Sequence, residues 1–205
     1  MTPARYREIR AAVVAAGFGH DIEWSEGLSF PETAEEFAGE AIWVVLCSGF
    51  SARAARGIMD RLWPMLGFDR RGVLSCSDKQ LRAVVKHPLK AAAIERIWRD
   101  RKELFADLQT HRGSVDDTLA FLETLPHIGP VTRFHLAKNI GIDCAKPDIH
   151  LTRIAQACGE TVDALCRRLA EATGDRIATV DYVLWRAAEQ RIVDSRALTP
   201  HAHNN

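Results

Sequence analysis

One carboxylate in the second half of the chain, Asp148, stands where it could take part in catalysis. It follows Pro147 and comes before an apolar helical pattern, so we expect it at the start of a helix. A carboxylate held there could stabilise a positively charged transition state or activate a water molecule. Aspartate is also a common helix N-cap, which is a purely structural role. Asp148 alone therefore leaves both roles open.

A turn about 20 residues earlier could bind phosphate. Residues 125–129, with the sequence LPHIG, separate two stretches of helical periodicity and predict a hairpin of two helices. The N-terminus of the second helix would present backbone N–H groups and a positive dipole end to a phosphate. The glycine would let a DNA backbone approach closely. Non-enzymatic DNA-binding proteins also use such hairpins, so the hairpin alone suggests DNA binding but does not distinguish an enzyme from a binding protein.

In this order, the two features resemble the helix-hairpin-helix DNA glycosylase superfamily. Its endonuclease III members have an LPGVG-type hairpin and, about 20 residues later, a V-D-x-H-x-x-R segment. Residues 125–129 match the hairpin, and Asp148, His150 and Arg153 match the later segment. The similarity weakens towards the N-terminus, over two stretches that look like helices of the family's barrel, residues 37–64 and 90–104.

The resemblance implies an all-α fold of two helical subdomains, with the hairpin motif at the cleft between them. Residues 1–205 would form a single glycosylase unit. A six-helix barrel would occupy residues 30–138 and include the hairpin motif at about 115–139, and residues 1–29 plus 140–205 would form the second subdomain. The residues independently favour an all-α protein, because no stretch shows sustained period-two alternation.

Local signals place several helix boundaries. Residues that commonly cap helices precede five of the helical stretches: Thr2, Ser51, Ser77, Ser114 and Thr161. Gly174 is suited to end the helix that begins after Thr161. The stripe that follows Pro88 predicts one continuous helix over residues 90–109.

The resemblance implies a monofunctional DNA N-glycosylase. Such an enzyme rotates a damaged or modified base out of double-stranded DNA and hydrolyses its N-glycosidic bond, leaving an abasic site. Asp148 would be the catalytic carboxylate that stabilises the oxocarbenium-like sugar and orients or deprotonates water. The base could be a repair lesion or a hypermodified base of phage DNA, which the residues do not distinguish. The residues expected to contact DNA are Arg53, His127, Ile128, Gly129, Val131, Thr132, Lys146, His150 and Arg153.

One position argues against strand cleavage. Bifunctional members carry a lysine nucleophile two residues after the second hairpin glycine, where this chain has Val131. A bifunctional glycosylase and abasic-site lyase would need a non-standard lysine, such as Lys138 or Lys146. The other alternative is a non-catalytic hairpin module that only binds DNA. The presence of Asp148 favours an enzyme, because binding a polyanion does not require a carboxylate.

The hairpin departs from the family at His127, which stands where glycine is usual. This residue would either strain the turn or add a phosphate contact. By position, the backbone carbonyls of Glu123, Leu125 and Ile128 could bind a structural K⁺ or Na⁺. No other cofactor is expected for a hydrolytic mechanism. An iron–sulfur cluster is not expected either, because Cys158 and Cys166 do not provide four closely spaced cysteines.

Aromatic residues are candidates for the base pocket and for a wedge that enters the duplex. The turn with Gly49 and Phe50 aligns loosely with the family's wedge-bearing turn, and Phe50 could intercalate. Trp24 and Trp43 are candidate pocket walls. Packing in the core explains each of these aromatic residues equally well.

Charge and composition limit the partners. The 205 residues carry no formal net charge, but residues 51–102 hold 13 basic and 5 acidic side chains, a net charge of +8. This basic segment could follow a phosphate backbone. No apolar run approaches the roughly 20 residues that span a bilayer. We therefore expect a cytoplasmic, prokaryotic-type monomer whose partner is double-stranded DNA and not a membrane.

Overall fold

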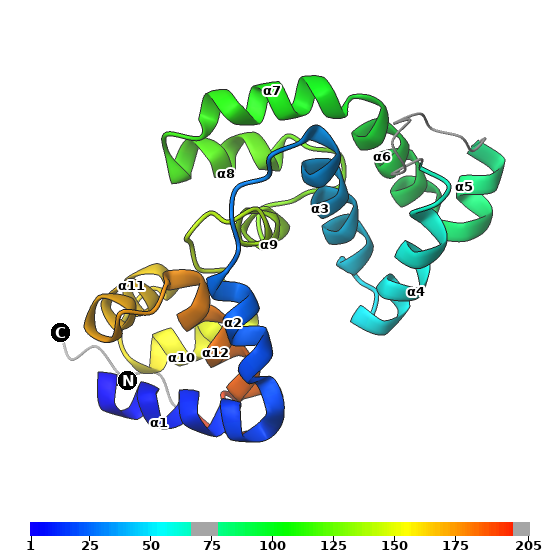
Figure 1. The fold of residues 1–205 in the computed structure, drawn as a ribbon. Helices are drawn as coiled ribbons and strands as arrows, with labels where there is room; N and C mark the ends of the chain where they lie inside the picture. Colours follow the sequence, from blue (N-terminus) through cyan, green and yellow to red (C-terminus); the bar gives the residue numbers. More distant parts are fainter. Residues whose placement is uncertain (67–77, 199–205) are drawn as a thin grey trace. The chain divides into compact units, whose positions relative to one another are not determined.

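The computed structural model of the chain describes residues 1–66 and 78–198. Within these ranges every regular element is helical, which confirms the predicted all-α class (Figure 1). None of the described helices is both long and apolar enough to cross a membrane. The chain divides into two compact units: unit 1 combines Met1–Ser29 with Gly141–Asn205, and unit 2 is Phe30–Ile140.

Unit 1 brings the two ends of the chain together. Its described elements are α1 (Pro3–Val13), the π-helix η1 (Val14–Phe18), α2 (Gly19–Glu26), α10 (Ile149–Ala157), α11 (Val162–Thr173) and α12 (Ile177–Glu189). Helix α12 packs against α1, α2, α10 and α11, and so forms the centre of the unit. Tyr6, Ile9 and Val13 of α1 are buried against apolar residues of α10, α11 and α12. Burial of these side chains is the main force that closes the unit.

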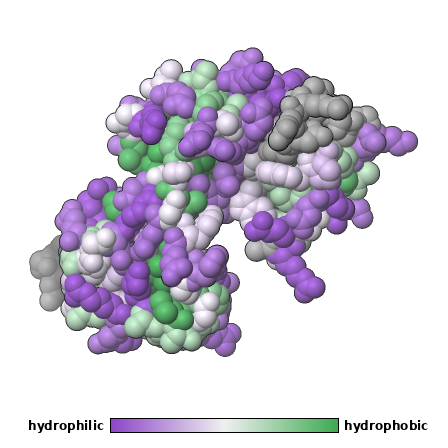
Figure 2. All heavy atoms as spheres, in the orientation of Figure 1, coloured by the Kyte–Doolittle hydropathy of each residue, from purple (hydrophilic) through white to green (hydrophobic). Residues whose placement is uncertain are grey.

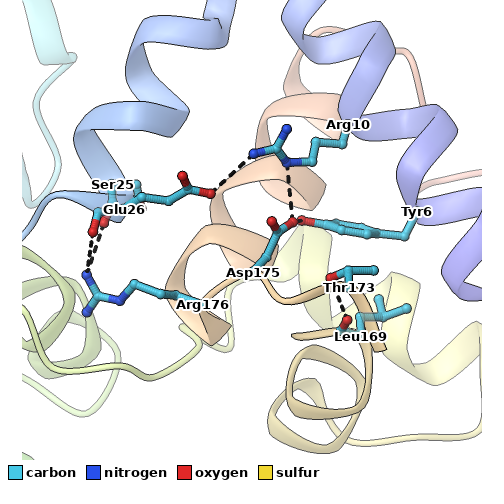
Figure 3. A network of polar contacts seen from close by, with 8 residues as sticks. All are labelled: Tyr6, Arg10, Ser25, Glu26, Leu169, Thr173, Asp175 and Arg176. Carbon is cyan, nitrogen blue, oxygen red and sulfur yellow. Dashed lines mark hydrogen bonds and ion pairs between the residues drawn. The ribbon is translucent and has the colours of Figure 1, made fainter. Parts of the chain in front are cut away.

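A polar network fixes the N-terminal helices of unit 1 to the segment before α12 (Figure 3). The Tyr6 hydroxyl donates to Asp175 Oδ2 at 2.5 Å, and Arg10 Nε lies 3.3 Å from the same oxygen. Arg176 Nη1 donates to the Ser25 carbonyl at 3.2 Å. Burial, together with the Asp175 carboxylate, raises the pKa of the Tyr6 phenol far above its ordinary value. The network therefore joins residues more than 140 positions apart.

Unit 2 is organised around one apolar helix. Its described elements are α3 (Ala34–Cys47), α4 (Ala52–Leu62), α5 (Asp78–Val85), α6 (Pro88–Arg99), α7 (Arg101–His111), α8 (Val115–Glu123) and α9 (Thr132–Asn139). Helix α3 packs against α4, α6, α7 and α9. Phe37, Ile42 and Val45 of α3 are all buried. The hairpin and the turn after α3 therefore belong to the same packed unit.

Four of the five predicted helix caps are confirmed, and the fifth, Ser77, lies outside the described residues. The side chains of Thr2, Ser51, Ser114 and Thr161 each accept a backbone N–H three residues ahead. Gly174 ends α11 with a φ of 82°, the left-handed conformation that glycine adopts without strain.

The prediction of a single helix over residues 90–109 is wrong, because the helix is interrupted at Asp100, between α6 and α7. Arg101 Nη1 donates to the Trp98 carbonyl at 2.8 Å, and Arg101 Nε donates to Glu35 of α3 at 2.9 Å. The Arg101 side chain thus bonds to a carbonyl in the last turn of α6 and ties the break to α3. The helix α2 was not predicted at all.

Candidate active site

Asp148 is the N-cap of α10. Its Oδ1 accepts the backbone N–H groups of His150 and Leu151, both at 2.9 Å. Its Oδ2 makes no hydrogen bond or ion pair with any residue in the described ranges, and the side chain is half-buried. The two oxygens therefore have different environments: one fixes the carboxylate to the helix, and the other is open to a water molecule or a cationic group.

The loop before Asp148 is fixed by the N-terminal part of α12. The Lys146 N–H donates to Asp181, a carboxylate that is only 2% exposed. Asp143 Oδ1 accepts the Ala178 N–H at 2.9 Å, and Arg176 Nη2 donates to the Gly141 carbonyl at 2.7 Å. These bonds hold the loop at several points and so position Asp148. Asp181 and Arg176 carry no local sequence signal of this role, because their partners lie 35 positions away.

Three other predicted site residues lie on or near α10. His150 Nδ1 is hydrogen-bonded to Ser195 Oγ at 2.9 Å, and Ser195 is buried. This bond gives His150 a structural role at one ring nitrogen. The side chains of Lys146 and Arg153 are half-buried and form no ion pair with the described residues, so both charges are available to a phosphate.

The hairpin between α8 and α9 is held by local bonds. Thr132 Oγ1 accepts the Gly129 N–H at 2.7 Å, and the Arg133 N–H donates to the Gly129 carbonyl at 3.0 Å. No side chain caps α9, because its N-cap residue is Val131. The Arg133 N–H is already bonded, so the first-turn N–H groups of Thr132 and Phe134 are the ones left for an external acceptor such as a phosphate.

The space beside Gly129 is open. A Cβ added there would meet nothing closer than Thr132 Oγ1 at 4.0 Å, so packing within the chain does not require glycine. The side chain of Ile128 is only 6% exposed, so a contact from this residue to DNA could come only from its main chain. Val131, in contrast, is 44% exposed, at the position where bifunctional members of the superfamily that the sequence resembles carry a lysine nucleophile.

His127 has a φ of 65°, in the left-handed region. The expected strain is therefore present, since this conformation costs a residue with a side chain about 1–2 kcal/mol. Its ring lies 6.1 Å from the ring of His87, the N-cap of α6. Burial lowers the pKa of His127, and the nearby charges of Lys90 and His87 lower it further. The exposed His127 could reach a phosphate, and its lowered pKa disfavours the charged form of the ring.

Lys90 connects this region to the turn after α3, a role for which the sequence gives no local sign. It is 3% exposed, and its Nζ donates to the Leu46 carbonyl at 3.2 Å and to the Ser48 carbonyl. The same Nζ lies 3.9 Å from the centre of the Phe50 ring. Burial lowers the pKa of Lys90. The buried ammonium of Lys90 thus stabilises the C-terminal end of α3.

The turn that could bear a wedge is the one held by Lys90. Gly49 has a φ of 79° with nothing within 4 Å of an added Cβ, and it is exposed. Phe50 is half-buried with one ring face against the Lys90 ammonium. The role of Phe50 as a wedge stays a prediction, and it would require the ring to leave this cation–π contact.

The two tryptophans differ in their surroundings. Trp43 of α3 is half-buried beneath the Arg56 guanidinium, which lies 4.7 Å from its ring centre. One turn earlier, Glu40 accepts a hydrogen bond from Asn139 at 2.9 Å, and burial raises the pKa of the Glu40 carboxyl. Trp24 of α2 belongs to unit 1 and is 52% exposed. The Arg56 guanidinium thus covers one face of Trp43, whose role as a pocket wall stays a prediction, whereas Trp24 is a surface residue.

The expected cation site stays a prediction. The Leu125 carbonyl accepts the Ile128 N–H at 3.1 Å, which leaves one of its two lone pairs for a cation. The carboxylate of Glu123 is paired with Arg133 at 2.6 Å. The expectation about an iron–sulfur cluster also stays a prediction, because Cys76 lies outside the described residues.

Comparison with known proteins identifies the fold. No protein-family model and no curated protein sequence matches the chain. The 8-oxoguanine DNA glycosylase of Thermotoga maritima matches with a TM-score of 0.64 and 19% identity, over 89% of this chain and 93% of that one. The 8-oxoguanine glycosylase/lyase of Methanocaldococcus jannaschii, solved with DNA containing 8-oxoguanine, matches with a TM-score of 0.61 and 17% identity, over 79% and 84%. The chain shares the helical fold of these glycosylases.

Proposed function

We propose that this protein is a DNA N-glycosylase that hydrolyses the bond between a damaged or modified base and its deoxyribose. The observation that carries the proposal is Asp148, whose Oδ1 is fixed by two backbone N–H groups while Oδ2 has no partner among the described residues. This carboxylate stands in the sequence motif of the glycosylase superfamily, in a chain with the fold of two glycosylases.

The reaction needs one carboxylate oxygen and one water molecule. As the glycosidic bond breaks, its electron pair leaves with the base, and positive charge develops on the sugar at C1′. The open Asp148 Oδ2 would stabilise this charge and accept a proton from the water that bonds to C1′. The departing base takes up a proton from solvent, and Asp148 returns the proton it accepted to solvent, so that the net reaction consumes one water molecule. An abasic site remains in the strand.

The hydrolytic mode follows from Val131. An aliphatic side chain cannot attack C1′ and form a Schiff base, and this one occupies the position where the bifunctional members carry lysine. Lys90 is no substitute, because it is 3% exposed and donates to two carbonyls. We therefore propose base release without strand cleavage.

DNA would be held by the unpaired N–H groups at the start of α9, beside the open space at Gly129. Lys146 and Arg153 would add phosphate contacts. Both structural neighbours act on 8-oxoguanine, so an oxidised purine is the first substrate to test. A hypermodified base of phage DNA is the second.

The decisive experiment is mass spectrometry of bases released from oxidised, alkylated and phage-modified DNA. Asp148→Asn should lower release by about 10²–10⁴-fold, the usual contribution of a general base. Asparagine caps helices as well as aspartate does, so the fold should not change. The matched control is Asp163→Asn, which alters an exposed carboxylate in the first turn of α11, in the same unit but away from the loop that positions Asp148.

Two results would contradict the proposal. If the Asp148→Asn variant released bases as fast as the wild type, Asp148 would serve only as the cap of α10. DNA binding without release from any substrate in the panel would favour a non-catalytic binding module. A covalent adduct with DNA trapped by borohydride would instead refute the hydrolytic mode and indicate a lysine nucleophile.

A further inference from the structure

Helix α4 carries arginines without acidic partners. Ten arginines of the described chain form ion pairs with carboxylates, whereas none of the three on α4 does. Arg56 stacks on Trp43. The exposed side chains of Arg53 and Arg61 make neither an ion pair nor a hydrogen bond with any described residue. Figure 2 shows hydrophilic side chains projecting where α4 lies in Figure 1.

These two arginines border an open groove of about 490 Å³ along α4. Small side chains line much of it, and an arginine contributes to each end of the lining. The full lining is Ser51, Arg53, Ala54, Gly57, Ile58 and Arg61. The one carboxylate of α4, Asp60, does not line the groove. The groove is therefore open, lined largely by small side chains, and positively charged.

Gly57 lies in the interior of α4, where glycine is unfavourable relative to alanine. A Cβ added there would meet nothing within 4 Å, so packing among the described residues does not require a glycine. The missing side chain keeps the groove open to close approach by another backbone.

We propose that this groove binds the phosphodiester backbone of double-stranded DNA, as a second contact in addition to the hairpin. The inference rests on the proposed function, in that DNA is the substrate. Arg53 and Arg61 are eight residues apart, or about 12 Å along the helix. That distance spans roughly three phosphates of one strand, at about 3.4 Å of axial rise each. Arginine suits this task, because its planar fork matches phosphate oxygens.

The test is the salt dependence of binding to an unmodified 20-base-pair duplex, measured by fluorescence anisotropy. Loss of two phosphate contacts in R53Q/R61Q should reduce the slope of log affinity against log salt by about 1.8. Between 50 and 200 mM KCl, the wild type should then lose about 12-fold more affinity than the variant does. The control R96Q/R99Q removes the same charge from α6 of the same unit, where both arginines are paired.

A second variant, G57L, keeps every charge and fills the groove. It should fold with an unchanged or higher melting temperature, because an added Cβ meets nothing within 4 Å and leucine favours helices more than glycine does. Its affinity for the duplex should fall at least fivefold. This variant separates contact within the groove from a general effect of charge.

The proposal is overturned if R53Q/R61Q and R96Q/R99Q change the slope equally, if G57L binds as the wild type does, or if the wild type binds no DNA. Base release by the wild type at saturating protein tests the proposed function separately. If R53Q/R61Q has a smaller salt slope than the wild type but the wild type releases no base, the groove is supported as a DNA site and the glycosylase activity is refuted.

Discussion

Replacing Lys90 by methionine removes the buried ammonium and keeps most of the apolar stem. Lys90 Nζ donates to the carbonyls of Leu46 and Ser48, at the C-terminal end of α3. Carbonyls in the last turn of a helix have no partner within the helix. The variant should therefore leave these two groups without the donor that now satisfies them.

The magnitude follows from the burial of each group. Leu46 is fully buried, so its carbonyl cannot readily bond to water, and leaving it unsatisfied costs about 1–3 kcal/mol. Ser48 is half-buried, so water can replace part of its bond. The lost cation–π contact with Phe50 adds about 0.5–1 kcal/mol. We expect a total destabilisation of about 3 kcal/mol, equivalent to a melting temperature lower by roughly 6–12 °C.

Calorimetry or circular dichroism measures this change, with Lys86→Met as the control. Lys86 is exposed and lies four residues earlier, and its side chain has no partner among the described residues. Lys86→Met should melt within about 2 °C of the wild type, because surface substitutions usually have small effects. If Lys90→Met also melted within that margin, the ammonium would not hold the end of α3, and the reasoning would be refuted.

Two further predictions concern titratable groups. The pKa of His127, followed by NMR, should lie below 6.5 and should rise in Lys90→Met. Because the folded state then binds this proton less readily than the unfolded state, His127 should lower the stability of the protein as the pH falls below 6.5. A wild-type pKa at or above 6.5 would contradict the geometry. Tyr6→Phe should lower the melting temperature by roughly 4–8 °C through loss of about 2 kcal/mol of charge-assisted hydrogen bonding to Asp175. Because the pKa of Tyr6 is raised in the folded state, wild-type stability should decline above pH 10, where the unfolded phenol ionises, and Tyr6→Phe should lack this contribution; equal alkaline profiles would refute it.

The sequence could predict features that depend on neighbouring residues. Ser51 and Ser114 accept N–H groups only three positions ahead, so residue type and spacing were sufficient to predict these helix starts. The same locality placed Asp148 at the start of a helix.

Features that depend on distant partners could not be predicted in this way. The break at Asp100 depends on Arg101 reaching Glu35, 66 positions earlier. Lys90 looks like a surface residue in the sequence, and its burial becomes evident only when its bonds to carbonyls 42 and 44 positions earlier are known. Asp181 likewise lies within an amphipathic helix without any local sign that it holds the loop before Asp148.

The capping and catalytic roles of Asp148 are compatible, because they use different oxygens. The two N–H bonds to Oδ1 restrict rotation of the carboxylate and so fix the direction of Oδ2. A catalytic carboxylate benefits from such fixation, because a group that is already oriented needs no reorganisation as charge develops. Asparagine can retain the bonds through its carbonyl oxygen but supplies no negative charge at the other position. Asp148→Asn therefore separates the two roles: unchanged melting together with lost base release would assign the cap to one oxygen and the chemistry to the other.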